Sequence, residues 1–112
     1  MCEENIKAFV PIKEEDFPRF YVCDEMKKLR EGLDERGIVW EDATSEYKDG
    51  LWICRTHFWY KGNRVSVIHG HGSYGGYDFI TKDQQLLEYY DGNSEPTGWL
   101  TADGVFELLE GK

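Results

Sequence analysis

The residues with the clearest capacity for chemistry lie in one aromatic and basic stretch, from Leu51 to Tyr77. It contains Arg55, Lys61 and Arg64 and no acidic residue, although the whole chain has 22 acids against 13 bases. Guanidinium groups beside aromatic rings can bind a planar anion through charge attraction and stacking together. We therefore predict that seven residues bind a small anionic ligand: Arg55, His57, Trp59, Arg64, His69, His71 and Tyr74.

The same stretch offers weaker patterns for metal, phosphate and nucleophilic chemistry. His69 and His71 are two residues apart and could hold a metal ion. Cys54 or His57 would have to complete such a site, but the spacing fixes no third ligand. The glycines between residues 70 and 76 follow neither the P-loop nor the dinucleotide-binding pattern, and they favour tight turns. We predict no catalytic residue, no bound metal and no cofactor.

The chain as a whole is strongly acidic, with a formal net charge of −9 over 112 residues. Direct binding of nucleic acid requires clustered Lys and Arg, so this charge argues against that class of protein. It favours a partner protein with a basic surface, although acidity also keeps a small protein in solution. The candidate contact residues are the acids of two polar segments: Glu14, Glu15, Asp16, Glu41, Asp42, Glu46 and Asp49.

Hydrophobic periodicity predicts two amphipathic helices. Apolar residues at steps of three and four indicate a helix over residues 21–36, which Gly37 ends. Gly32 inside this helix suggests a close contact with the sheet. A last helix begins after Thr101 as its N-cap and stops near Gly111. In this interpretation the helix over residues 21–36 is core scaffolding without chemistry.

Alternation and turn residues predict the strands. Residues 38–40 form a short strand, and the acidic segment 41–50 after it is a loop. Residues 51–60 and 64–69 form a hairpin, in which the side chains of Arg55, His57 and Trp59 face away from the helices. Residues 86–90 form a third strand. Trp99 and Leu100 are expected to form a hydrophobic staple that packs on Val105 or Phe106 of the last helix.

Together these elements predict an α+β fold in a single domain. An antiparallel sheet of about three to four strands packs against the two amphipathic helices, which cover one face. The length of 112 residues suffices for one hydrophobic core. We expect this domain to span residues 21–112 and an N-terminal arm to span residues 1–20.

Cysteine usage and hydropathy indicate the compartment. The three cysteines are an odd number without Cys-x-x-Cys spacing, which favours reduced thiols. No apolar run approaches the roughly 20 residues that span a bilayer, and the N-terminus is too acidic for a secretory signal. We therefore expect a cytoplasmic protein without a membrane partner.

Short motifs in this layout resemble those of small proteins that are common in bacteriophage and prophage genomes. The resemblance rests on a Leu-Arg-x-x-Leu-Asp-x-x-Gly-Ile helix end at residues 29–38, on the hairpin, and on a Leu-Thr-Ala-x-x-Val helix start at residues 100–105. Gly104 departs from the group, where a better helix former is usual. The group carries no catalytic motif, and the resemblance implies an inhibitor of host machinery, including bacterial immunity.

The sequence leaves two functions open. The first is a non-enzymatic inhibitor whose acidic surface occupies a basic, nucleic-acid-binding groove on a host protein. The alternative is the sequestration of a small anionic ligand, such as a signalling nucleotide, on the hairpin and the glycine-rich loop. An exposed aromatic sheet face would also suit a homodimer.

Overall fold

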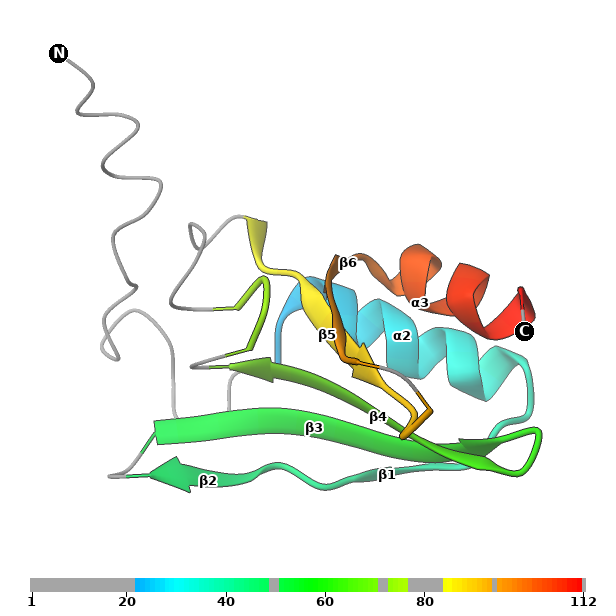
Figure 1. Ribbon diagram of the computed structural model, residues 1–112, viewed down its shortest axis with the longest axis horizontal. Coiled ribbons are helices and arrows are strands. Elements are labelled where there is room, and N and C mark those ends of the chain that lie inside the picture. The colour runs from blue at the N-terminus through cyan, green and yellow to red at the C-terminus, as the bar shows by residue number, and fades with distance from the viewer. Residues whose placement is uncertain (1–21, 49–50, 71–72, 77–83, 94, 112) are drawn as a thin grey trace, which may run out of the picture.

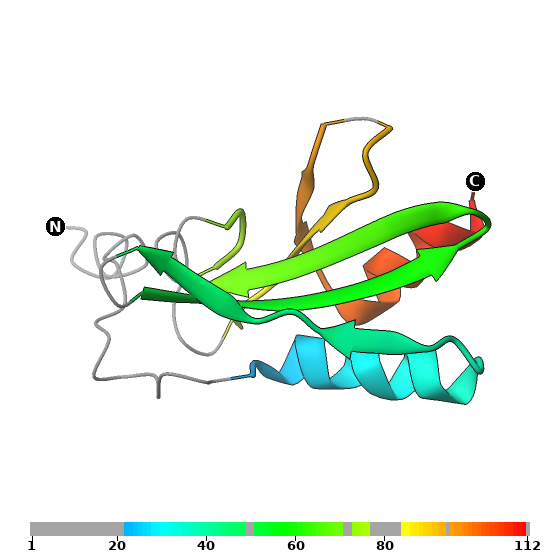
Figure 2. The ribbon, with the colours of Figure 1, turned by 90° about the horizontal axis from the view of Figure 1, so that it is seen from below.

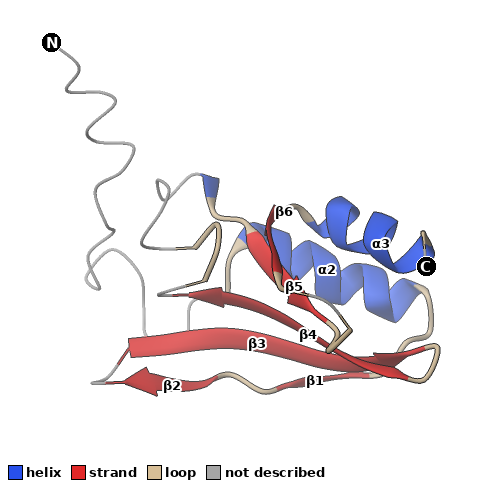
Figure 3. Cartoon of the chain, in the orientation of Figure 1, coloured by secondary structure: helices blue, strands red, loops and turns tan. Residues whose placement is uncertain are grey.

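The computed structural model describes residues 22–48, 51–70, 73–76, 84–93 and 95–111. In this part of the chain, α2 (Asp24–Glu35) and α3 (Ala102–Glu110) lie on the same side of an antiparallel sheet (Figure 1, Figure 3). The predicted α+β class, with two amphipathic helices on one face, is therefore confirmed. The predicted N-terminal arm lies outside the described residues.

The sheet is larger than the sequence suggested. Its strands are β1 (Trp40–Asp42), β2 (Ser45–Lys48), β3 (Leu51–Tyr60), β4 (Asn63–Gly70), β5 (Leu87–Tyr90) and β6 (Thr97–Leu100). They follow the order β1-β3-β4-β5-β6, and β2 also pairs with β3. Because β1 and β2 lie end to end along one edge of β3, the six strands fill five positions. The prediction of three to four strands was too low.

Two strands account for the difference. β2 lies in the acidic segment that reads as a loop, because its polar residues lack an apolar alternation. It still forms a strand at the edge of the sheet, where pairing with β3 on one side is sufficient. β6 pairs with β5 across an irregular register, and Trp99 has a positive φ of 61°. Neither feature gives the regular alternation from which a strand is predicted.

The β3–β4 hairpin follows the sequence closely. Lys61 and Gly62 form its two-residue turn with φ angles of 51° and 83°, the pair of positive angles that a type I′ turn requires. Along β3 the side chains of Cys54, Thr56 and Phe58 are buried against the helices, as the alternation predicted. Arg55, His57 and Trp59 therefore project from the opposite side of the sheet.

The helices bury the predicted apolar stripes. Met26, Leu29 and Leu33 of α2 are fully buried, and Gly37 ends that helix with a φ of 69°. Thr101 caps α3 by accepting a hydrogen bond from the backbone N–H of Gly104 at 3.1 Å. Neither α2 nor α3 is long and apolar enough to cross a membrane.

The two helices pack against each other in parallel. Their N-terminal ends are joined by a hydrogen bond from the backbone N–H of Ala102 to Glu25 Oε1 at 2.8 Å. Their C-terminal ends are joined by an ion pair between Arg36 and Glu110 at 3.5 Å. Between these points, a Cβ at Gly32 would lie 2.6 Å from the Phe106 ring. The close contact at Gly32 is thus with α3, and the expected contact with the sheet was wrong.

A polar cluster around Arg30 lies between α2 and the sheet. Its Nε donates to Thr56 Oγ1 at 2.8 Å, and Nη2 donates to the carbonyl oxygen of Arg55 at 3.4 Å. The guanidinium also lies 3.5 Å from Asp42 and 4.8 Å from the centre of a Trp40 ring. Arg30 thereby ties the first helix to both β1 and β3.

Candidate functional site

The face of the sheet that points away from α2 and α3, called the outer face here, carries most of the predicted ligand residues. Among the described residues no helix covers it (Figure 2). The strand register aligns outward side chains of neighbouring strands in rows. Three rows cross the outer face: Glu41, His57, Ser66 and Tyr90; Arg55, Ile68 and Glu88; and Trp59 with Arg64.

The structure brings four of the seven predicted ligand residues together and separates two others. Arg55, His57, Trp59 and Arg64 share the outer face. His69 is fully buried on the opposite side of the sheet, where its Nε2 lies 2.6 Å from Gln85 Oε1. Tyr74 is exposed in the turn over residues 73–76, and His71 lies outside the described residues.

The outer face is not basic, although the stretch of sequence that forms most of it contains no acid. Glu41 of β1 lies beside His57, and Glu88 of β5 lies in the row of Arg55. The charges of the two guanidinium groups at positions 55 and 64 are therefore balanced by two carboxylates. Charge balance between the strands could not be foreseen without their order in the sheet.

Two grooves hollow this face, and His57 lines both. One has a volume of about 180 Å³ and lies between β1 and β3, with Trp40, Trp59 and Arg64 among its lining residues. The other, of about 280 Å³, lies over β3, β4 and β5 and is lined by Arg55, His57, Ser66, Ile68, Glu88, Tyr90 and Pro96. Each groove combines apolar surface with charged groups, which suits a specific binding contact.

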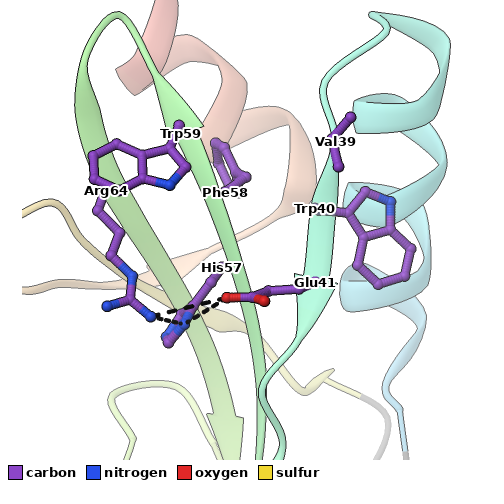
Figure 4. A pocket seen from close by; sticks show the side chains of 7 residues that line it. All are labelled: Val39, Trp40, Glu41, His57, Phe58, Trp59 and Arg64. Atoms are coloured by element: carbon purple, nitrogen blue, oxygen red, sulfur yellow. Dashed lines mark hydrogen bonds and ion pairs between the residues drawn. The ribbon is translucent and has the colours of Figure 1, made fainter.

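His57 is held in one tautomer by its neighbours (Figure 4). Arg64 Nη2 lies 2.8 Å from His57 Nδ1, and because a guanidinium can only donate, Nδ1 must accept. The proton of the neutral ring is therefore on Nε2. Glu41 Oε1 lies 3.8 Å from the same Nδ1 and 3.9 Å from Arg64 Nη2. The cluster presents His57 as a neutral hydrogen-bond donor between the grooves.

Burial lowers the pKa of His57 below its usual value of 6.5, and the guanidinium groups of Arg64 and Arg55 lower it further against the opposing effect of Glu41. We expect the His57 pKa to rise in Arg64→Ala and to fall further in Glu41→Gln, as followed by NMR of the ring protons. Since the unfolded chain takes up this proton first, stability should decrease as the pH falls through 6.5 towards the folded pKa. An unchanged His57 pKa in Arg64→Ala would refute this account.

The acids predicted to contact a partner are only partly within the described residues. Glu41 is exposed at the edge of the outer face. Asp42 accepts hydrogen bonds from Thr44 and forms an ion pair with Arg30. These internal contacts neutralise part of the Asp42 charge. Glu46 lies in β2, where only its backbone is described. Glu14, Glu15, Asp16 and Asp49 lie outside the described residues.

A second acidic surface lies on the helices, where the sequence analysis predicted no partner contact. Seven acids of α2 and α3 are exposed: Asp24, Glu31, Asp34, Glu35, Asp103, Glu107 and Glu110. The apolar stripe of each helix could have predicted their exposure, because these acids lie at the helix positions outside the stripe, which face solvent. What the sequence did not show is that the two helices lie side by side, with acids of both helices at their C-terminal ends.

Comparisons of this chain with protein families, with curated proteins and with solved structures find no match.

Proposed function

We propose that this protein is a non-enzymatic inhibitor that acts in the cytoplasm by binding a host protein with a basic surface, such as a component of bacterial immunity. Its contact surface is the layer of exposed carboxylates on α2 and α3, together with those of the β1 region. The observation that carries the proposal is the concentration of acids at the C-terminal ends of two parallel helices.

These helix ends are electrostatically unusual. The C-terminal end of a helix carries a partial negative charge and is normally stabilised by basic residues. The last turns of α2 and α3 contain no basic residue, whereas Asp34, Glu35, Glu107 and Glu110 are exposed there. Arg36, which follows α2, offsets only part of this charge. An arrangement that does not favour folding supports a role in binding a basic partner.

A pocket at the same end provides space for a partner side chain. It has a volume of about 370 Å³ and is lined by Arg36, Ile38, Tyr60, Phe106, Leu109 and Glu110. Arg36 itself stacks on the Phe106 ring, 3.8 Å from its centre, and pairs with Glu110. A lysine or arginine of the partner can use the same surfaces, with its aliphatic part on Leu109 and its charge near Glu110.

The test is the capture of host proteins from a bacterial lysate with the unchanged protein and with Glu107→Lys. Glu107 is exposed in the last turn of α3, so the substitution reverses one charge of the contact surface. We expect affinity for the captured partner to fall about tenfold. The free energy of unfolding should rise by about 0.5 kcal/mol, because a base then lies at the helix C-terminus. Weaker binding would thus not result from unfolding.

Glu95→Lys is the matched control, since it changes the net charge equally from the exposed turn between β5 and β6. It should leave the affinity within about twofold. Complexes of the unchanged protein should also weaken steeply between roughly 0.05 M and 0.5 M salt. A partner that binds equally well across this range, or that responds equally to both substitutions, would show that the helices are not the contact surface.

Binding of a small anion on the outer face stays a second prediction, and one observation favours it. Arg55 lines the larger groove, and its guanidinium forms no ion pair among the described residues. Native mass spectrometry of the gently purified protein, before and after heating, would reveal a retained anion. Its loss in Arg55→Ala and Arg64→Ala would support this function, whereas retention in both variants would exclude the site.

A further inference from the structure

The charges of the outer face are arranged in a pattern that is complementary to itself. Arg55 on β3 and Glu88 on β5 lie in one row, with Ile68 on the central strand β4 between them. Among the described residues neither forms an ion pair, with the other or with a third group, although both line the larger groove. Within the described part of the chain, the Glu88 carboxylate accepts a hydrogen bond from the backbone N–H of Tyr74 at 2.8 Å.

Large aromatic side chains accompany these charges. Trp59 is 66% exposed and Tyr90 is 45% exposed, and both belong to rows of the outer face. Trp, Tyr and Arg are the residue types that contribute most to protein interfaces. A sheet face of this composition, which no helix of the described residues covers, has the character of an interface.

We propose that two copies of this chain associate through their outer faces. The two-fold axis lies between the two faces and runs parallel to β4. A half-turn about this axis places β3 of one subunit over β5 of the other. Arg55 then faces Glu88 of the partner subunit, and Glu88 faces Arg55 of the partner subunit. Ile68 meets Ile68 of the partner subunit near the axis. The two opposite charges that remain apart within one chain are thereby neutralised twice in the dimer.

The pattern of rows selects a second copy over another occupant. A two-fold interface requires that if one residue contacts a second, the second also contacts the first across the axis. Opposite charges one strand to either side of β4, in the same row, satisfy this condition. Stacked sheets lie about 10 Å apart, which side chains of the length of Arg, Glu and Tyr can fill from both sides. The helices remain on the outside, so this inference does not depend on the proposed inhibitor function.

The test uses two charge reversals, Arg55→Glu and Glu88→Arg, with the mass measured by light scattering after size exclusion. The unchanged protein should have twice the 13.1 kDa of one chain. Each variant alone places like charges opposite each other twice, and its dissociation constant should rise at least about a hundredfold. In an equimolar mixture, each variant supplies the charge that the other has lost, so both opposite-charge pairs are restored in the mixed dimer. The mixture should therefore recover the dimer mass.

Two further variants make each outcome decisive. Glu88→Gln keeps an oxygen for the Tyr74 N–H and removes only the charge, so it should weaken the dimer without disturbing the fold. Glu107→Lys, on the exposed side of α3, should leave the dimer unchanged although it weakens the capture of a host partner. A monomeric unchanged protein, a dimer indifferent to Arg55→Glu, or a mixture of folded variants that stays monomeric would each overturn the inference.

Discussion

Arg30→Met should lower the free energy of unfolding by about 3 kcal/mol, a large part of the roughly 5–15 kcal/mol that holds small domains folded. Methionine retains most of the aliphatic volume but donates no hydrogen bond. The hydroxyl of Thr56 then loses the donor that reaches it at 2.8 Å. The carbonyl oxygen of Arg55 loses the donor at 3.4 Å and keeps the N–H of Ala43 at 2.8 Å. Urea unfolding followed by tryptophan fluorescence measures the loss.

Lys28→Met is the matched control, because it removes a base from an exposed position of the same helix. The Lys28 ion pair with Glu25 is solvated, so the control should change stability by less than about 0.5 kcal/mol. Similar effects of both substitutions would mean that the buried contacts of Arg30 do not stabilise the fold.

Arg30→Met should also change how the stability of the protein depends on pH. Burial would raise the pKa of Asp42, but hydrogen bonds from Thr44 and the guanidinium of Arg30 outweigh it and hold the pKa below 3.8. A carboxyl whose pKa is lowered by folding stabilises the protein above its unfolded pKa, and that contribution is lost as the pH falls through the folded value. We therefore expect the free energy of unfolding to fall less steeply below pH 3.8 in Arg30→Met than in the unchanged protein.

Gly98→Ala should lower the free energy of unfolding by about 3 kcal/mol, at the upper end of the range for overpacking. A Cβ at Gly98 would overlap the Cβ of Tyr74 and lie 3.0 Å from its carbonyl oxygen. That oxygen also accepts a hydrogen bond from the backbone N–H of Trp99 at 3.2 Å. The new methyl group must therefore displace the turn from β6. Thermal unfolding by circular dichroism measures the effect.

Gly104→Ala tests the opposite case in the first turn of α3. There a Cβ would lie 3.3 Å from Leu100 Cδ2, the end of a flexible side chain that can move. Alanine should stabilise the helix by about 0.5 kcal/mol. A stable Gly98→Ala protein would show that the Tyr74 turn can leave β6 without affecting the rest of the fold.

Local patterns in the sequence were sufficient to predict the elements that have a regular hydrophobic periodicity. The stripe of Met26, Leu29 and Leu33 predicted α2, and the alternation around Phe58 predicted which side of β3 is buried. Both depend on residues that are close in sequence. The structure also confirms the N-cap at Thr101, whose function requires only the three residues that follow it.

The outer face could not be predicted in the same way, because its composition depends on which strands are neighbours. Glu41 joins the row of His57, and Glu88 joins the row of Arg55, only through the strand order. The burial of His69 had the same origin, since its partner Gln85 lies 16 residues further along the chain. The sequence therefore predicted the hairpin as an element of the fold, but not the two carboxylates that neighbouring strands bring to its outer face.

The pairing of α2 with α3 has a consequence for how the protein reaches its fold. The hydrogen bond between Glu25 and Ala102 joins residues 77 positions apart. Contacts of such long range slow folding, because a long segment of chain loses freedom before the contact stabilises it. During synthesis, the part of α2 around Gly32 that packs on Phe106 stays uncovered until α3 is made. Truncation before α3 should therefore leave a chain that needs chaperones or aggregates.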